Sequence, residues 1–350
     1  MNREHVGEVK DVPDVKLTFS AFDVSIKIFA ALTGTDSAAY PGAGVDISNL
    51  GEVDAVISVK DPDVEDYVKT IHGRKLQVQD FSFSYSVDGD STEDYTIIGS
   101  ERRYLKYDVI VDKFITGTTS FTLSETPIQL LNGNKALSVV MDGEYLTEVA
   151  SGPATGEYSI SGTTLTTFDS MASQLLAVYH ADPTGENWTD ISDASIPVAI
   201  RGKDVAVTIS TEAIDRVQSV TINGNMNIKP VKELGNRSNV GYQRQVPTIE
   251  GTITVLDTDT DLISLLTNGV IGSGIEWGIG ELCTTVDIPL KIELYDPCDA
   301  TVPYTVLKTI YLPSISIVGD SYSMNVNDNA SLVFNYKSED SAMLIYSGSM

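Results

Sequence analysis

The sequence predicts a mainly β protein: a β-sandwich or half-barrel domain with short flanking helices, duplicated, plus an inserted small β-sandwich. Three observations support this fold class. Apolar and polar residues alternate with a period of two along much of the chain, which is typical of strands with one buried face. Turn-forming Gly, Asn and Asp residues separate or interrupt these segments, and only two short stretches carry helical spacing.

Ten segments alternate clearly enough to be predicted as strands. They are residues 16–20, 24–29, 54–59, 104–111, 136–141, 204–209, 248–255, 288–294, 311–317 and 331–336. Pairs such as Asp88-Gly89, Asp142-Gly143 and Asn223-Gly224 mark turns between strands or bulges within them. The chain is therefore expected to be mostly β.

Two segments are predicted as helices. Residues 61–73 have an acidic N-cap, Pro62 at the first helical position, apolar residues at helical spacing and Gly73 at the end. Residues 259–269 repeat this pattern and end at Gly269. Each helix is expected to lie across a sheet.

The chain is expected to divide into four parts. These are an N-terminal arm at 1–13, a first domain at 14–117, an inserted small β-domain at 118–182 and a second domain at 183–350. The inserted part is rich in Ser, Thr and Gly turns between short strands, which is the texture of a small β-sandwich. A weak internal repeat relates the stretch from Val78 to Gly99 to the stretch from Val217 to Gly235.

The charge excludes several function classes. The 350 residues contain 23 Lys and Arg against 49 Asp and Glu, a formal net charge of −26, with 42% hydrophobic residues. Such a surface repels phosphate, so we expect neither groove-reading nucleic-acid recognition nor docking to an anionic membrane. The apolar fraction is high enough for real cores, so the chain is not an acidic disordered tail.

The chain is expected to fold in a cytosol. No apolar run reaches the roughly 18 residues needed to cross a bilayer, and the first ten residues lack the apolar core of a signal peptide. The two cysteines, Cys283 and Cys298, are expected to be free thiols, although pairing in an oxidising setting stays open.

No catalytic constellation is predicted, and the expectation is a protein that is not an enzyme and needs no cofactor. The three histidines, His5, His72 and His180, are scattered and are expected at the surface or in turns. The motifs of serine hydrolases, phosphate-binding loops and zinc proteases do not occur.

The strongest metal candidate is residues 257–261, with three alternating aspartates. Because the Gly and the acidic residue of a calcium loop are replaced by Leu262 and Asn268, no metal site is predicted there. The acidic stretch 88–94 is interpreted as a solvated loop. Three Asn-x-Ser/Thr sequences, at Asn187, Asn236 and Asn329, carry no weight without secretion.

Three motifs in the second half carry a resemblance. "VQSVTINGN" at 217–225, "VKELGNR" at 231–237 and "VPTIEGTITV" at 246–255 occur in that order, followed by late strands ending in "SLVFNYK" at 331–337. Over residues 196–345 this order resembles the major tail (tail tube) proteins of long-tailed bacteriophages. Residues 83–88, 98–100 and 102–104 look like a divergent version of the same unit in the first half, with Ile-Ile-Gly-Ser in place of Glu-Leu-Gly-Asn.

The resemblance implies a structural virion protein that self-assembles into stacked rings, whose channel delivers the genome to the host. Its implied partners are further copies of itself, a tape-measure protein and a tail-terminator protein, while DNA passes without specific binding. An acidic wall would suit a conduit that must not hold DNA. If both halves are tube domains, three chains close a pseudo-hexameric ring; if only the second is, six chains do.

Two sets of candidate site residues follow. Alternation places Thr248, Glu250, Thr252 and Thr254 on one polar face of a strand, and this face, together with Asp108, is the candidate lumen lining, with an ordinary solvated face as the alternative. The candidate ring-stacking or subunit contacts are Met226, Ile228, Val231, Glu233, Leu234, Gly235 and Asn236 in the second half and Ile98 and Gly99 in the first.

Two other function classes stay open at this point. A capsid or tail decoration, or an adhesin-type β-sandwich, would be a binding module, and the adhesin would need a secretion signal. A carbohydrate-active enzyme would need a cleft with paired carboxylates and aromatic platforms, but the chain has only Trp188 and Trp277. The acidity could also reflect a saline habitat.

Overall fold

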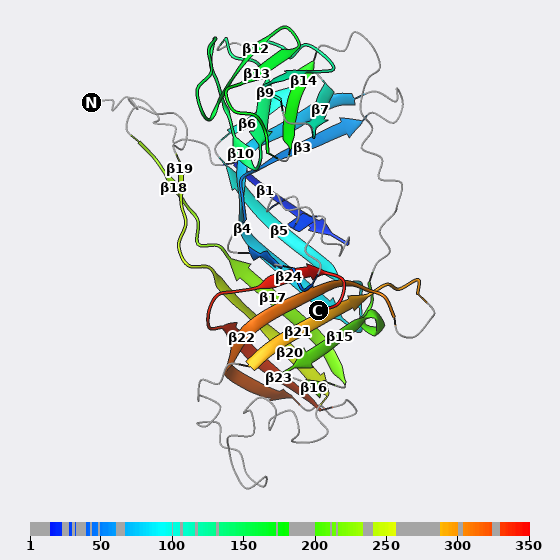
Figure 1. Cartoon of the computed structure of the whole chain (residues 1–350). Coiled ribbons are helices and arrows are strands. Elements are labelled where there is room, and N and C mark those ends of the chain that lie inside the picture. The colour runs from blue at the N-terminus through cyan, green and yellow to red at the C-terminus, as the bar shows by residue number, and fades with distance from the viewer. Residues whose placement is uncertain are drawn as a thin grey trace, which may run out of the picture. The chain divides into compact units, whose positions relative to one another are not determined.

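The structure is a computed structural model of the whole chain. It describes residues 15–22, 28–29, 32, 40–42, 44–47, 50–60, 67–99, 101–105, 108–115, 118–130, 133–172, 174–181, 200–210, 212–214, 216–233, 241–256, 288–299, 304–323 and 330–350. In these residues the predicted mainly β fold is confirmed, because strands make up most of the described chain (Figure 1). The predicted helix at 259–269 lies outside the described residues.

The chain forms two compact units whose boundaries differ from the expected domains. Unit 1 comprises residues 1–53, 77–100 and 195–350, and unit 2 comprises residues 54–76 and 101–194. The expected first domain, 14–117, is thus shared between the two units, and the expected insertion, 118–182, is only a part of unit 2. The 20-residue strand β4 (Tyr67–Ser86) runs from unit 2 into unit 1.

Unit 1 contains most of the long strands. They are β1 (Val15–Ala21), β2 (Val45–Asp46), the second part of β4, β5 (Thr92–Gly99), β15 (Val205–Ile209), β16 (Glu212–Ala213), β17 (Val217–Asn225), β18 (Lys229–Val231), β19 (Gly241–Gln243), β20 (Thr248–Leu256), β21 (Ile288–Tyr295), β22 (Val306–Ser323), β23 (Ser331–Ser338) and β24 (Leu344–Ser347), with a short 3-10 helix at Gly202–Asp204.

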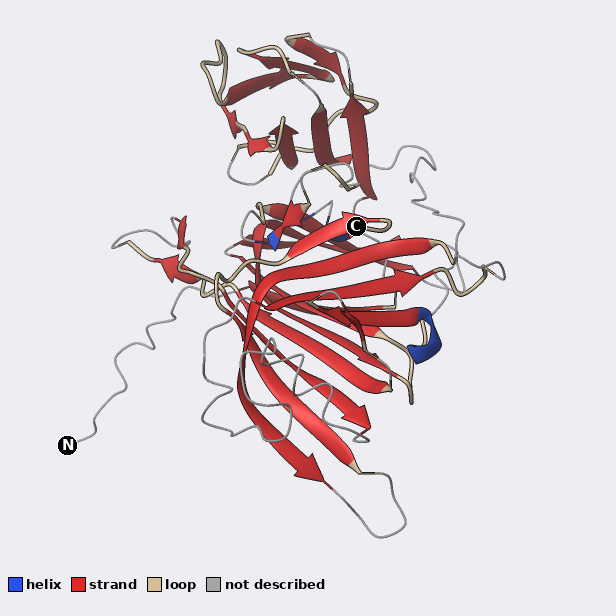
Figure 2. Cartoon of the chain, turned by 60° about the horizontal axis from the view of Figure 1, so that its bottom comes forward, coloured by secondary structure: helices blue, strands red, loops and turns tan. Residues whose placement is uncertain are grey.

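One twisted antiparallel sheet organises unit 1, in the order β1-β5-β4-β17-β20-β23-β22-β21-β15-β16 (Figure 2). Its strands alternate buried and accessible residues, so one face is packed and the other is open. Four strands separate β5 from β22 in this sheet, yet Lys308 of β22 contacts Glu93 of β5 across the packed face. This contact shows that the sheet is curved.

Two glycines in the central strands are covered by aromatic rings of neighbouring strands. A Cβ atom on Gly224 of β17 would lie 1.9 Å from the Phe81 ring, and one on Gly251 of β20 would lie 2.5 Å from the Tyr336 hydroxyl. The sequence Asn223-Gly224 therefore continues a strand instead of forming a turn, since the close approach of a ring requires glycine there.

Four consecutive strands occur twice, with matching lengths and pairing. The first set is β3 (Val53–Lys60), β4, β5 and β6 (Glu101–Leu105), with 8, 20, 8 and 5 residues. The second is β21, β22, β23 and β24, with 8, 18, 8 and 4 residues. In each set the long strand pairs with its first strand. It pairs with its fourth strand through its first half and with its third strand through its second half.

The register of the central hairpin, β4–β5 and β22–β23, is the same in the two sets. Adding 239 to each residue number turns every β4–β5 pair, from Gln77–Ile98 to Ser84–Thr92, into a β22–β23 pair, from Ser316–Lys337 to Ser323–Ser331. The bulge between Val78 and Asp80 recurs between Ile317 and Gly319. β1 on β5 and β20 on β23 also occupy equivalent places. The chain thus contains a structural repeat, which we call repeat 1 (β1 and β3–β6) and repeat 2 (β20–β24).

This repeat follows a different alignment from the one expected. The sequence comparison matched residues 78–99 with residues 217–235, and so β4 with β17, but β4 and β17 are neighbours that pair antiparallel. The equivalents of β4 and β5 are β22 and β23. Few residues mark the true alignment; the clearest is Lys69-Thr70-Ile71 against Lys308-Thr309-Ile310.

Unit 2 is a small β-sandwich joined to a ribbon. The ribbon is β3, the first part of β4, and β6. The sandwich strands are β7 (Asp108–Phe114), β8 (Ser120–Thr122), β9 (Leu137–Met141), β10 (Glu144–Tyr145), β11 (Thr147–Glu148), β12 (Glu157–Ser161), β13 (Thr164–Thr167) and β14 (Leu175–Ala181). They form two sheets, β10-β9-β14-β7 and β11-β12-β13-β8, which share one apolar core, as expected for the inserted part.

Three local predictions were wrong. Residues Tyr67–Gly73, expected to end a helix, belong to β4. Ile28 and Phe29, expected at the end of a strand, are helical, and Phe29 is buried against Phe83 and Tyr95. The segment 104–111 is divided between β6 and β7 instead of forming one strand.

Candidate functional site

The open face of the unit 1 sheet contains the candidate lumen residues of β20. Glu250 is exposed and Thr248, Thr252 and Thr254 are partly exposed, whereas Ile249, Ile253 and Val255 are buried. The predicted alternation of β20 is confirmed. These four residues therefore lie on the face of the sheet that points away from the core.

The same face continues across the neighbouring strands, and its side chains are short and polar. The register places Asn223 beside Glu250, Thr221 beside Thr252 and Ser219 beside Thr254. We call this surface the polar face; it comprises Lys16, Thr18, Ser20, Asp80, Ser82, Ser84, Ser86, Thr92, Asp94, Thr96, Ser219, Thr221, Asn223, Asn225, Thr248, Glu250, Thr252, Thr254, Ser316, Ser331, Asn335 and Lys337, together with the aliphatic Ile98 and Val333. Hydroxyl and amide groups thus run across seven adjacent strands.

Hydrogen bonds between strands hold these side chains in place. The Ser82 hydroxyl donates to the Asn223 side-chain oxygen at 2.6 Å, and the Thr221 and Thr252 hydroxyls lie 2.8 Å apart. The Ser20 hydroxyl also donates to the Asp94 carboxylate. Cross-strand polar pairs of this kind stabilise a sheet modestly and fix the side chains along it.

A shallow hollow of about 280 Å³ lies on the polar face over β5, β4, β17 and β20. Its lining includes three carboxylates, Asp80, Asp94 and Glu250, and the short side chains around them. Burial raises the pKa of Asp80 above its usual value, although the positive charge of Lys16 opposes this shift. The hollow is therefore an acidic depression in an otherwise hydroxyl-rich surface.

Asp108 does not belong to the polar face. It begins β7 and pairs with Ala181 in a sheet of unit 2, whereas Glu250 lies in the sheet of unit 1. The grouping of Asp108 with the β20 residues was wrong. Both segments alternate in the sequence, but alternation does not say which sheet a strand joins.

The candidate stacking residues of the second half lie on and around a hairpin, β18–β19, that projects beyond the main sheet of unit 1 (Figure 1). Val231 is 41% exposed, and Glu233 is exposed as well. Met226 and Ile228, at 5% and 8%, are already covered by unit 1 itself, where they line a small cavity with Ile47, Leu50 and Val78. The expectation that these two need cover from a partner was therefore wrong.

The remaining stacking candidates lie elsewhere. Leu234, Gly235 and Asn236 are outside the described residues. Ile98 and Gly99 lie in β5, where Ile98 pairs with Lys16 on one side and Gln77 on the other. A strand paired on both sides has no free backbone edge, so this part of β5 offers no sheet edge to a partner.

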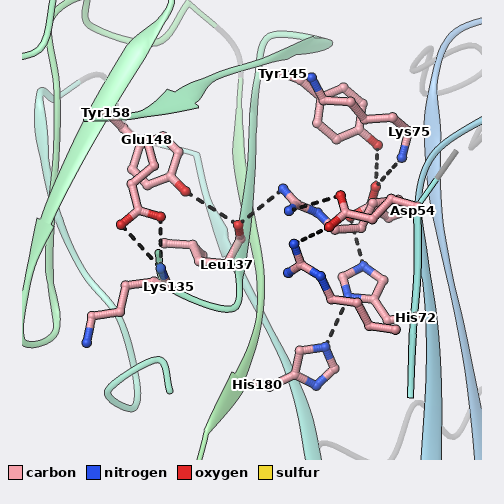
Figure 3. A network of polar contacts seen from close by, with 12 residues as sticks. Asp54, His72, Lys75, Lys135, Leu137, Tyr145, Glu148, Tyr158 and His180 are labelled. Atoms are coloured by element: carbon pink, nitrogen blue, oxygen red, sulfur yellow. Dashed lines mark hydrogen bonds and ion pairs between the residues drawn. The ribbon is translucent and has the colours of Figure 1, made fainter. Parts of the chain in front are cut away.

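Unit 2 contains a buried pair of histidines that the sequence did not predict (Figure 3). His72 Nδ1 lies 3.0 Å from His180 Nε2, and His72 Nε2 lies 3.0 Å from Asp54 Oδ2. The two rings are 1% and 0% exposed, which corrects the expected surface placement. The sequence analysis missed His72 because it expected a helix where β4 lies. Along the strand, alternation turns Thr70 and His72 toward the interior.

Asp54 anchors this pair. Its other oxygen accepts hydrogen bonds from the Tyr145 hydroxyl at 2.7 Å and from the Lys75 backbone N–H at 3.1 Å (Figure 3). Burial raises the pKa of Asp54, but the hydrogen bond and charge of His72, with Tyr145 and Lys75, outweigh it and hold the pKa below 3.8. When both imidazoles are neutral, His72 donates to Asp54 and accepts from His180. Because the rings are closed off from solvent, they order the interior of unit 2.

The core of unit 1 contains a buried ion pair. Lys308 and Glu93 are both 0% exposed, and Glu93 also accepts hydrogen bonds from the Tyr85 and Tyr95 hydroxyls at 2.9 and 2.8 Å. The Lys308 ammonium lies 5.2 Å from the ring centroids of both Phe29 and Phe83. Glu93 was expected in a solvated acidic loop; it lies instead in the core, because β5 begins at Thr92.

Other site classes find little support in the described residues. No group of three or more His, Cys, Asp or Glu side chains among them could hold a metal ion, and residues 257–261 are outside the description. Cys298 is an exposed free thiol, while Cys283 is not described. No helix in the described part of the chain is long and apolar enough to cross a membrane. Searches of protein-family models and of curated proteins found no match to this chain.

Proposed function

We propose that this chain is a structural virion protein that assembles into stacked rings forming the tail tube of a long-tailed bacteriophage, through which the genome reaches the host. The observation that carries the proposal is the polar face: seven adjacent strands present short hydroxyl, amide and acidic side chains on one surface of a curved sheet. Such a surface suits the wall of an aqueous channel better than an adhesive site.

The charge of the chain supports this use. DNA binds proteins mainly by exchanging condensed counterions for Lys and Arg side chains. The described part of the polar face has two basic residues, Lys16 and Lys337, beside three carboxylates, and the chain as a whole has a formal charge of −26. A channel lined by this face would let DNA slide without holding it.

The repeat supports self-assembly. A chain that contains two equivalent sets of strands in one sheet already contains one junction between them, in which β17 pairs with β4 of repeat 1 and with β20 of repeat 2. Closed rings are built from such head-to-tail junctions, repeated until the rotation closes. The small β-sandwich of unit 2, β7–β14, lies between the two repeats in the sequence and has its own core, so we assign it a separate role as a decoration.

Electron microscopy of the purified full-length chain at high protein concentration tests the proposal. Rings or tubes with an open channel are the expected result, without any added cofactor. A particle that stays monomeric at every salt and protein concentration would reject a tube protein and leave the decoration or adhesin class.

A further inference from the structure

The ribbon of unit 2 has an exposed side. Asp54 and His72 lie on its inner side, where they contact each other inside unit 2. The residues that alternate with them lie on the opposite side, which we call the ribbon face: Ile57, Val59, Lys69, Ile71, Arg102 and Tyr104. Ile57, Val59 and Tyr104 are 38%, 42% and 55% exposed. Exposed apolar side chains that share one face of a sheet indicate a surface that a partner covers.

Repeat 2 contains the same face, and there it is buried. The register of β4 with β6 equals that of β22 with β24, since the pair Ile71–Tyr104 corresponds to the pair Ile310–Ile345. β3 and β21 both have eight residues and correspond position by position. The counterparts of the apolar ribbon-face residues are all 0% exposed: Ile292 for Ile57, Leu294 for Val59, Ile310 for Ile71 and Ile345 for Tyr104.

Repeat 1 covers part of this buried face. Lys308, the counterpart of Lys69, forms the ion pair with Glu93, and its ammonium lies 5.2 Å from the ring centroid of Phe83. Glu93 of β5 and Phe83 of β4 are directly opposite each other in their hairpin. Through Lys308, the face of repeat 2 that corresponds to the ribbon face thus packs against the β4–β5 hairpin of repeat 1.

The corresponding hairpin of repeat 2, β22–β23, is exposed at the equivalent position. Tyr322 and Leu332 are opposite each other there, as Phe83 and Glu93 are in repeat 1. Tyr322 is 55% exposed, whereas Phe83 is 0% exposed. Repeat 2 therefore presents an aromatic ring to solvent at the place where Lys308 covers a ring in repeat 1.

We propose that the ribbon face of one copy of this chain packs on the β22–β23 hairpin of a second copy, and so repeats between chains the contact that Lys308 makes between the repeats within one chain. This inference rests on the proposed function and names a contact between its subunits. In this contact Lys69 takes the place of Lys308, and Tyr322 takes the place of Phe83.

The aromatic neighbours of the two lysines support this correspondence. The Lys308 ammonium lies 5.2 Å from the ring centroids of both Phe29 and Phe83. The Lys69 ammonium lies 4.7 Å from the Tyr104 ring centroid, and the proposed contact supplies Tyr322 as its second ring.

Charge also favours a second copy as the occupant. The ribbon face has two exposed basic residues, Lys69 and Arg102, although the chain has a formal net charge of −26. On the hairpin, the exposed Asp320 lies on the same side of β22 as Tyr322. The two surfaces are therefore complementary in charge, and because they are different parts of the chain, the contact is head-to-tail and adds one copy after another until a ring closes.

Ile57→Asp and Val111→Asp make a matched test of the ribbon face. Both residues are 38% exposed and lie in strands of unit 2, but Val111 belongs to β7 of the sandwich. Ile57→Asp removes an apolar side chain from the contact and buries an unpaired charge there, so it should raise the protein concentration needed for assembly about tenfold or more. Val111→Asp should assemble within about twofold of the wild type.

Tyr322→Asp and Tyr304→Asp test the hairpin in the same way, since these tyrosines are 55% and 50% exposed. A mixture then tests the direction of the contact. The Ile57→Asp chain keeps an intact hairpin, and the Tyr322→Asp chain keeps an intact ribbon face. In analytical ultracentrifugation, an equimolar mixture should form dimers, but no larger assemblies, at protein concentrations where each variant alone stays monomeric.

Hydroxyl-radical footprinting of the wild-type chain provides a second measurement that needs no variant. Tyr104 and Tyr322 are each 55% exposed in the single chain. In assembled particles both rings should lose most of their reactivity, because the centre of an interface excludes solvent. Tyr304 lies outside both surfaces and should stay reactive.

The outcomes separate this inference from the proposed function. If the wild-type chain does not assemble at all, both are rejected. If it assembles while Ile57→Asp and Tyr322→Asp assemble as readily as their controls, or while Tyr104 and Tyr322 stay reactive in the particles, only the inference is overturned. A mixture of the two variants that stays monomeric at every protein concentration also overturns it. If a variant does not fold, footprinting decides alone.

Discussion

Replacing Lys308 by Met should destabilise unit 1 strongly. The ammonium is fully buried between Glu93 and two phenylalanine rings, so its removal leaves a carboxylate inside the core with only the Tyr85 and Tyr95 hydroxyls to stabilise its charge. Removing one partner of a buried ion pair costs about 3–5 kcal/mol, because the other charge is left without compensation. In a domain of this size, that loss lowers the melting temperature by about 6–20 °C.

The repeat supplies a matched control for this substitution. Lys69 occupies the equivalent position in repeat 1, within the same Lys-Thr-Ile sequence, but it is exposed and its ammonium lies 4.7 Å from the Tyr104 ring centroid. Lys69→Met should therefore change stability by about 1 kcal/mol at most. Thermal unfolding followed by circular dichroism at neutral pH compares the two variants.

A double variant tests the cause. In Lys308→Met with Glu93→Gln, the buried charge is gone while an acceptor oxygen remains for the two tyrosines, so a substantial part of the lost stability should return. The reasoning fails if Lys308→Met melts within a few degrees of Lys69→Met. It also fails if the double variant is no more stable than Lys308→Met alone.

Three further predictions concern acid, DNA and ring mass. The folded-state pKa of Asp54 lies below 3.8, so the stability that its carboxylate gives unit 2 is present above pH 3.8 and is lost as the pH falls through the folded-state pKa. The Asp54→Asn variant should therefore melt at a lower temperature than the wild type at pH 7 and should lack this acid dependence. Thermal unfolding between pH 7 and 2.5 measures both effects. Glu250→Lys with Asp94→Lys, both on the polar face, should make assembled tubes retain DNA at low salt and release it as salt rises; co-sedimentation equal to the wild type would show that this face does not line the channel. Native mass measurement of one ring should give about three times 37.7 kDa if each chain supplies two repeats, whereas six times that mass would show one tube domain per chain.

Alternation predicted individual strands well because it is a local consequence of backbone geometry. In β20, the polarity of each side chain indicates whether it lies on the packed or the open face of the sheet. The two faces could therefore be assigned without knowing any partner strand. Residues 67–73 show the limit of the method. Their apolar residues fit a helical and an extended spacing equally, and pairing of β4 with β6 decides between them.

The site residues that the sequence missed depend on contacts between distant segments. His72 and His180 are 108 positions apart, and Glu93 and Lys308 are 215 apart, so no local pattern brings either pair together. The same holds for Asp108, whose strand alternates like β20 but joins another sheet. Long-range pairing is what single-sequence patterns do not contain.

The buried ion pair shows how the two repeats have diverged. Glu93 belongs to repeat 1 and Lys308 to repeat 2, so their contact joins the repeats within one chain. The residue equivalent to Glu93 in repeat 2 is Leu332, and the residue equivalent to Lys308 in repeat 1 is the exposed Lys69. A junction between two chains that copied the internal one would therefore place Leu332 where Glu93 lies and would lack this ion pair. The buried ion pair therefore belongs to the contact between the two repeats within one chain, and a contact of repeat 2 with a following copy would have to be stabilised by other groups.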